Sequence, residues 1–153
     1  MQETLKTHWE NWKFTIPILL LLFLMWPMIK GTYYKNFGEE NPESSIRWRG
    51  SFQAALEESE SSGKPILLDF SASWCPPCQV MKHEVWTDSE VGKVANDRYV
   101  PLLIDVDVPE TRYLSQRYQV SSIPTILIID SKGQILKRSG ALSASAMTDF
   151  LNP

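Results

Sequence analysis

The longest apolar stretch of the chain lies near its N-terminus, with a charged residue at each end. Residues 14–29 carry no charge between Lys13 and Lys30. A helix over them covers roughly 24 Å, which is short for a hydrocarbon core of about 30 Å. Flanking aromatic residues and snorkelling lysines extend the usable span. We therefore expect residues 14–30 to form a transmembrane signal anchor, after an N-terminal flank over residues 1–13.

A cleaved secretory signal is the competing interpretation of this stretch. Cleavage requires small residues at A-x-A spacing, whereas the stretch ends in Trp26-Pro27-Met28-Ile29-Lys30. An uncleaved anchor is therefore favoured. Lysines lie on both sides of the anchor, so the positive-inside rule does not decide its orientation. Residues 31–45 show no apolar period and are expected to be a linker.

The rest of the chain alternates between helical and strand-like periodicity. Apolar positions at helical spacing begin at Phe52 and stop before Gly63, which suits a left-handed helix cap. The apolar run Ile66–Phe70 favours a strand buried on both faces. Prolines are tolerated in a first helical turn, so a helix is expected to begin at the Pro76-Pro77 pair and to run to about Trp86.

The same alternation continues toward the C-terminus. Thr87-Asp88-Ser89-Glu90 has the spacing of a capping box and is expected to open a helix. A second buried strand is expected over residues 100–106, and a crossover helix beginning at Pro109. Apolar runs on both sides of Asp130-Ser131-Lys132-Gly133 are expected to pair as an antiparallel hairpin. Ser143 can cap a last short helix.

Strand and helix units followed by a hairpin predict an α/β fold with a mixed central sheet and helices on both faces. This domain is expected to occupy residues 46–153, because 153 residues are too few for two full cores. The composition is globular, with 43% apolar and 22% charged residues. A net charge of −3 provides no basic face, so nucleic acid is not an expected partner.

The two cysteines, Cys75 and Cys78, stand just after the first predicted strand. A disulfide between them would close too short a loop to constrain the unfolded chain, so its role is not to stabilise the fold. A dithiol that exchanges with disulfides needs one thiolate to attack and a second thiol to resolve the mixed disulfide. A helix N-terminus stabilises a thiolate on Cys75, and Cys78, one turn inward, is expected to be less exposed.

Two other interpretations of the cysteine pair stay open. The pair could be buried structural cysteines or a two-coordinate soft-metal site. Structural zinc is not expected, because His8 and His83 supply no second ligand pair at finger spacing. The sequence therefore predicts no resident metal and no cofactor.

Beyond the spacing, the residues around the cysteines resemble a known family. The segment Leu68–Cys78, which reads LDFSASWCPPC, resembles the thioredoxin active-site segment, and Ile123-Pro124-Thr125 resembles its second half. The flanks Gly63–Leu68 and Glu84–Val91 are similar to the C-terminal thioredoxin-like domain of bacterial membrane thiol:disulfide interchange reductases and their single-domain relatives. The resemblance covers about Arg47 to Leu151 and implies a thioredoxin-like fold.

The resemblance also implies roles for single residues. It makes Asp69 the buried acid that exchanges a proton with the resolving thiol, and the Ile123-Pro124 bond cis, with the Ile123 backbone pairing with substrate. Trp74 is expected to shape the substrate surface. An ordinary strand-end aspartate, strand-start proline and packed tryptophan are the plainer alternatives. Thioredoxins carry a lysine near the acid on the next strand, whereas Pro101–Asp105 has none.

These features predict a protein-disulfide reductase or thiol:disulfide interchange oxidoreductase. We expect it to be a single-pass protein of the inner membrane whose domain faces the periplasm. Its expected partners are disulfide-containing proteins, an upstream thiol reductant and the membrane. The alternative function is a redox-sensitive chaperone or soft-metal carrier that uses the same fold as a binding module.

Overall fold

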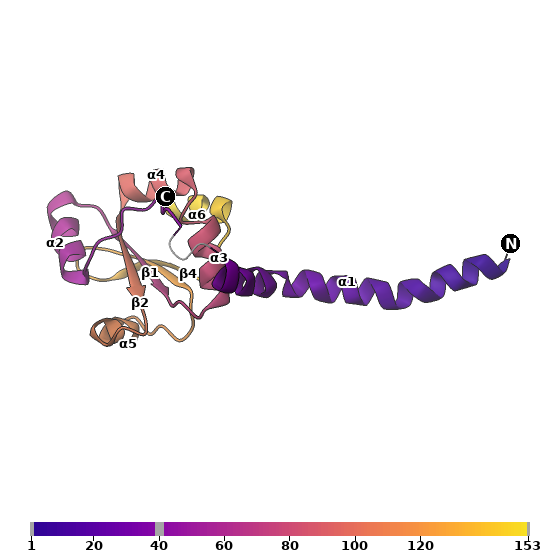
Figure 1. The fold of residues 1–153 in the computed structure, drawn as a ribbon. Helices are drawn as coiled ribbons and strands as arrows, with labels where there is room; N and C mark the ends of the chain where they lie inside the picture. Colours follow the sequence, from indigo (N-terminus) through magenta and orange to yellow (C-terminus); the bar gives the residue numbers. More distant parts are fainter. Residues whose placement is uncertain (1, 39–41, 153) are drawn as a thin grey trace.

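The structure is a computed structural model that describes residues 2–38 and 42–152, with side chains from Thr15 onward. In Figure 1 a long helix, α1 (Gln2–Phe37), projects away from the sheet and the other helices. Only its C-terminal end reaches them, where it packs against α3 (Pro76–Glu84). The chain therefore has an extended apolar arm joined to an α/β domain.

The domain is built on a four-stranded mixed sheet with the strand order β2-β1-β3-β4. Strand β1 (Ile66–Ser71) lies parallel to β2 (Val100–Asp105) and antiparallel to β3 (Thr125–Ile129). Strand β4 (Ile135–Ser139) pairs antiparallel with β3 and completes the predicted hairpin. Gly133, with φ of 78°, provides the left-handed residue of that turn. The predicted mixed sheet is confirmed.

Helices cover both faces of this sheet, as predicted. On one face, α3, α4 (Ser89–Arg98) and α6 (Ala144–Leu151) share a core with Leu67. On the other, α2 (Phe52–Ser62) packs with Leu68, and α5 (Arg112–Arg117) follows a short 3₁₀ turn, Pro109–Thr111. Side chains alternate along a strand, so Asp69 faces the same side as Leu67, toward α3.

Local capping signals set several helix ends. Gly63, with φ of 71°, closes α2, and the Ser143 hydroxyl accepts a hydrogen bond from the first turn of α6, so both caps are confirmed. The capping-box prediction is wrong at its first residue. Asp88, not Thr87, is the N-cap of α4, because its carboxylate accepts two amide hydrogen bonds while the Thr87 hydroxyl donates to the carbonyl of His83.

Helix α1 continues beyond Lys30 into the segment expected to be a linker, and ends at Phe37. Contacts with α3 hold this extension: the Lys30 ammonium lies 2.6 Å from a carboxylate oxygen of Glu84, and the Tyr34 hydroxyl donates to Glu84 at 2.8 Å. The Tyr34 ring also stacks on His83, with 4.5 Å between centroids. Of the expected linker, residues 39–41 lie outside the described residues.

Gly31 brings the two helices together at the cysteine motif. A Cβ atom at this position would lie 2.2 Å from the carbonyl oxygen of Pro76, so a side chain has no room. Farther along, a Cβ atom on Gly38 would lie 3.0 Å from the His83 ring. The two contacts run in the same order along both helices, so α1 and α3 run side by side in the same direction.

Candidate redox-active site

Cys75 and Cys78 form a disulfide at the N-terminus of α3. Cys75 is the N-cap residue, and Pro76 and Pro77 fill the first turn, where a missing N–H leaves no hydrogen bond unmade. The backbone N–H of Cys78 donates to the Cys75 sulfur at 3.3 Å. The first turn therefore directs an amide at this sulfur even though both intervening residues lack one.

Both cysteines are buried in this oxidised form, each with 2% of its surface exposed. The prediction that Cys78 is less exposed than Cys75 is therefore wrong for the disulfide. The Cys75 sulfur lies 3.7 Å from the carbonyl oxygen of Ile123, and Ala72, Val106 and Ile123 pack around the pair. Contacts from three separate segments cover the sulfurs, and sequence spacing carries no information about them.

The second expected segment lies beside the cysteines. The Ile123-Pro124 peptide bond is cis, as the resemblance implies. Pro124 is buried and Ile123 is half-buried. The carbonyl of Ile123 faces the Cys75 sulfur, so the structure brings this segment and the cysteine pair together.

Trp74 is a large exposed side chain next to the disulfide, with 53% of its surface accessible. Its indole N–H donates to a carboxylate oxygen of Asp107 at 2.7 Å. Asp107 was not among the residues that the sequence singled out. Asp107 follows the end of β2, as Trp74 follows the end of β1. Because the two strands are parallel, their carboxyl ends meet at one edge of the sheet, so the predicted pairing of these strands could have indicated Asp107.

Asp69 lies on β1 beneath α3 and is 2% exposed. The indole N–H of Trp86 donates to its Oδ2 at 2.8 Å, while Oδ1 has no hydrogen-bond partner in the described part of the chain. Burial raises the pKa of Asp69 to about 7, and the hydrogen bond from Trp86 opposes that rise. This carboxyl can therefore gain or lose a proton near neutral pH.

A pocket of about 210 Å³ opens beside Asp69 and Cys78. Trp86 and Leu103 are among its other walls. The β1–β2 register pairs Asp69 with Leu103, so an apolar residue stands next to the acid on the neighbouring strand. The acid and the inner cysteine thus share one small, mostly apolar space.

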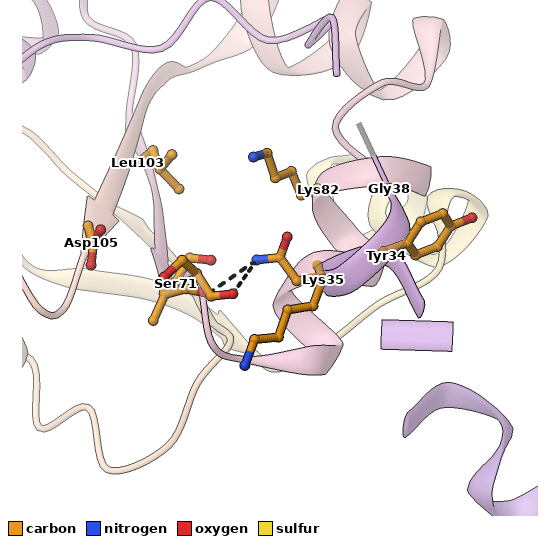
Figure 2. A pocket seen from close by; sticks show the side chains of 10 residues that line it. Tyr34, Lys35, Gly38, Ser71, Lys82, Leu103 and Asp105 are labelled. Atoms are coloured by element: carbon orange, nitrogen blue, oxygen red, sulfur yellow. Dashed lines mark hydrogen bonds between the residues drawn. The ribbon is translucent and has the colours of Figure 1, made fainter. Parts of the chain in front are cut away.

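A larger cleft, of about 600 Å³, lies between the end of α1, α3 and the edge of the sheet. Figure 2 shows Lys35 and Lys82 extending into it from the two helices, with Leu103 and Asp105 on the far side. Ser71, Lys82 and Leu103 line both this cleft and the smaller pocket. The two spaces therefore adjoin at these residues.

The residues whose side chains the structure describes offer no cluster of three or more His, Cys, Asp or Glu that could hold a metal ion. His83 instead stacks on Tyr34. The disulfide is thus the reactive group that the geometry presents.

A disulfide at a helix N-terminus, next to a buried acid and a cis-proline segment on a mixed sheet, defines a thiol:disulfide oxidoreductase. The sequence profile of the family described as thioredoxin-like matches residues 47–131. The chain therefore belongs to the thioredoxin-like family, and the resemblance noted in its sequence is confirmed.

Relatives of known class agree with this assignment. Thioredoxin Y, chloroplastic, from Oryza sativa subsp. japonica is 34% identical over 97 residues, which cover 63% of this chain and 53% of the relative. Thiol:disulfide interchange protein DsbD 1 from Pseudomonas aeruginosa is 33% identical over 102 residues, or 64% of this chain and 17% of that protein. The chain thus spans about half of the first and a small part of the second.

A solved structure named DsbH oxidoreductase superposes with a TM-score of 0.63 at 25% identity, covering 76% of this chain and 93% of that one. That protein shares the α/β thioredoxin-like fold predicted from the sequence, and the superposition covers nearly all of its chain.

Proposed function

We propose that this protein is a membrane-anchored thiol:disulfide oxidoreductase that reduces or exchanges disulfides in extracytoplasmic proteins. One observation carries the proposal: the Cys75–Cys78 disulfide lies at the start of α3, beside the buried carboxyl of Asp69. Membership of the thioredoxin-like family supports the chemistry. The proposed substrates are proteins with disulfides, and an upstream dithiol donor supplies the electrons.

The proposed reaction begins with the reduced pair. The Cys75 thiolate attacks a substrate disulfide, a mixed disulfide forms, and one substrate sulfur leaves as a thiolate. Cys78 then gives its proton to the Asp69 carboxylate, and the Cys78 sulfur attacks the sulfur of Cys75. The Cys75–Cys78 disulfide forms and the second substrate thiolate leaves, so two electrons pass to the substrate. The upstream dithiol reduces the pair again by the reverse exchange.

Residues around the disulfide are the proposed substrate surface. Trp74 is exposed beside Cys75, and its bond to Asp107 fixes the indole. The half-buried Ile123, followed by the cis Pro124, offers backbone groups next to the attacking sulfur. An extended substrate segment lying along Ile123 would bring its own disulfide to Cys75.

The proposed anchor is the apolar part of α1. Within Thr15–Phe37 an 18-residue window has a mean hydropathy of 1.6, and the apolar side chains from Ile16 to Ile29 are exposed. A helix with apolar side chains on all its faces needs a lipid or protein environment. The contacts of Lys30 and Tyr34 with Glu84 support an uncleaved anchor, because the end of this helix is part of the folded domain.

The geometry also suggests where the disulfide would lie. If residues 14–30 cross the bilayer, Gly31 stands at the headgroup level, and Gly31 touches Pro76 of the redox motif. The disulfide would then open close to the membrane surface. The periplasmic side is proposed from the reducing chemistry and from the likeness to the interchange proteins.

The test of the proposed activity uses the full chain in detergent micelles. With a dithiol donor, the protein should reduce insulin disulfides over many turnovers, and Cys75→Ser should abolish this activity. Cys78→Ser should accumulate a mixed disulfide with the substrate, because the resolving thiol is gone. Thiol-dependent binding of one soft-metal ion without turnover would overturn the proposal in favour of a carrier.

The side of the membrane needs a separate measurement. After mild reduction of intact cells, a membrane-impermeant maleimide should label Cys75 and Cys78. Labelling that occurs only after lysis would contradict the periplasmic assignment, and recovery of the protein in the soluble fraction would contradict the anchor.

A further inference from the structure

The pocket beside Asp69 contains a charged side chain to which neither the sequence nor the proposed reaction assigns a role. Lys82 lines this pocket together with Asp69 and Cys78. Among the described residues that line it, Lys82 is the one with a basic side chain. The other wall residues are apolar or uncharged: Pro42, Ser44, Trp48, Ser71, Cys78, Trp86 and Leu103.

Helical spacing puts Lys82 on the face of α3 that lies over Asp69. Cys78, Lys82 and Trp86 are four residues apart in turn, so they form one stripe along this part of the chain. Cys78 and Trp86 both reach the space around Asp69, the first through the pocket and the second by a hydrogen bond. Lys82 therefore lies between two residues that already serve the acid.

The direction of the Lys82 side chain supports the same placement. Figure 2 shows it reaching from α3 toward Leu103 on β2. Leu103 is the register partner of Asp69 on the neighbouring strand. The Lys82 side chain therefore extends toward the strand position that pairs with Asp69.

Lys82 also stands where the inner pocket meets the outer cleft. It lines both spaces, as do Ser71 and Leu103. A carboxyl that is 2% exposed needs a path by which its proton reaches solvent. The inner pocket, at about 210 Å³, is large enough to admit water, and Lys82 lies at its boundary with the open cleft.

We infer that Lys82 is a positioning residue for the proton exchange of Asp69. Its ammonium stabilises the Asp69 carboxylate across the inner pocket and orders the path from that carboxylate to the outer cleft. The proton that Cys78 gives to Asp69 then leaves along this path into the outer cleft. The inference rests on the proposed function, since it gives a partner to the acid of that reaction.

The test compares Lys82→Met, Lys82→Arg and Lys93→Met in the full chain in micelles. Lys93 is an exposed lysine on α4 that does not line either space, so its variant controls for the loss of one charge from a helix. The measurements are the pH profile of insulin reduction and a ¹³C NMR titration of Asp69 in the reduced protein. Thermal unfolding of each variant checks that the fold is retained.

Lys82→Met should move the Asp69 titration and the matching limb of the rate profile to higher pH. A shift of at least about half a unit is expected, because an adjacent opposite charge changes a carboxyl pKa by about 1–3 units and Lys82 acts across a pocket. Lys82→Arg keeps the positive charge, so its Asp69 titration should stay close to that of the wild type. Lys93→Met should leave the rate profile unchanged. A purely structural role would change the melting temperature without moving the titration.

Asp69→Asn separates this inference from the proposed function. If Asp69→Asn removes the limb of the rate profile but Lys82→Met does not move it, the inference about Lys82 is wrong and the proposed reaction stands. If Asp69→Asn leaves rate and profile unchanged, the role of the acid fails, and the role of Lys82 fails with it.

Discussion

The indole N–H of Trp86 donates to the carboxyl of Asp69 at 2.8 Å, in the core between α3 and the sheet. Trp86 is the aromatic residue just beyond the end of the motif helix, and Asp69 lies on the strand that leads into the motif. One hydrogen bond thus ties the strand before the disulfide to the chain that follows its helix. It also opposes the effect of burial, which raises the pKa of Asp69 to about 7.

Trp86→Phe should raise the pKa of Asp69 above this value. The phenyl ring keeps most of the packing, but the carboxylate loses its donor, and a hydrogen bond to a charged group contributes about 1.5–3 kcal/mol, equivalent to roughly 1–2 pKa units. A ¹³C titration of Asp69 measures the change. Trp48→Phe is the matched control, because the Trp48 indole donates to Ser44 instead. An unchanged titration in Trp86→Phe would show that the bond does not govern this acid.

Asp69 should also make the stability of the protein depend on pH. Its pKa is raised by folding from an ordinary value of 3.8 to about 7. Below about pH 4 the carboxyl is protonated in both states, so no penalty arises. As the pH rises toward 7, the unfolded chain loses the proton while the folded chain keeps it, so stability falls, by up to about 4 kcal/mol.

Asp69→Asn should remove this dependence and make the oxidised protein more stable than wild type at pH 7. Urea unfolding of the full chain in micelles at several pH values measures the free energy of unfolding. Asp97→Asn on α4 is the control, since that aspartate is exposed. Equal pH slopes for wild type and Asp69→Asn would contradict a folded-state pKa near 7.

Much of this arrangement could be predicted from local sequence. The apolar run at Ile66 predicts the central strand, the proline pair predicts the helix start, and the turn at Gly133 predicts the hairpin. Each signal acts within a few residues, and the fold follows from their order. The boundary of α4 was missed because Thr87 and Asp88 both suit a cap, and tertiary contacts of Thr87 decide between them.

Contacts between distant segments could not be predicted in the same way. Lys30 and Glu84 are separated by 54 positions, and nothing in their own neighbourhoods indicates that they pair. The burial of Cys75 depends on Ile123, which comes from another strand end. The hydrogen bond between Trp86 and Asp69 likewise requires that α3 lie over β1. Periodicity indicates which face is apolar, but not which side chain meets which.

Gly31→Ala should loosen the end of α1 from α3. The new Cβ would lie 2.2 Å from the Pro76 carbonyl oxygen, so the helices must separate. In an unpacked helix the same change would be stabilising by about 1 kcal/mol, because alanine favours helix over glycine. The sign of the effect therefore reports whether the two helices touch in solution.

Hydrogen exchange of the amides of Tyr34 to Phe37, in the full chain in micelles, measures this contact. Faster exchange in Gly31→Ala is the expected result. Gly50→Ala is the control, because a Cβ there meets nothing within 4 Å. Slower exchange in Gly31→Ala would mean that α1 ends as an independent helix and that the redox motif is not held against the anchor.

The two prolines between the cysteines should limit how strongly the first turn stabilises the Cys75 thiolate. An N-cap side chain accepts hydrogen bonds from the amides at the second and third helical positions, which are Pro77 and Cys78 here. Cys78 supplies its amide at 3.3 Å, whereas Pro77 has none to give. Pro77→Ala adds the missing donor and should therefore increase the thiolate fraction of Cys75 at a given pH.

The rate of iodoacetamide alkylation of reduced Cys75, followed against pH in a Cys78→Ser background, measures this fraction. The midpoint should fall by about one unit in Pro77→Ala, as expected for one hydrogen bond to a charged acceptor. Pro76→Ala restores an amide at the first helical position, which a cap seldom uses, so its effect should be smaller. A larger fall of the midpoint in Pro76→Ala than in Pro77→Ala would contradict this account. The thiolate would then be stabilised by the helix dipole and nearby charge rather than by hydrogen bonds from individual amides.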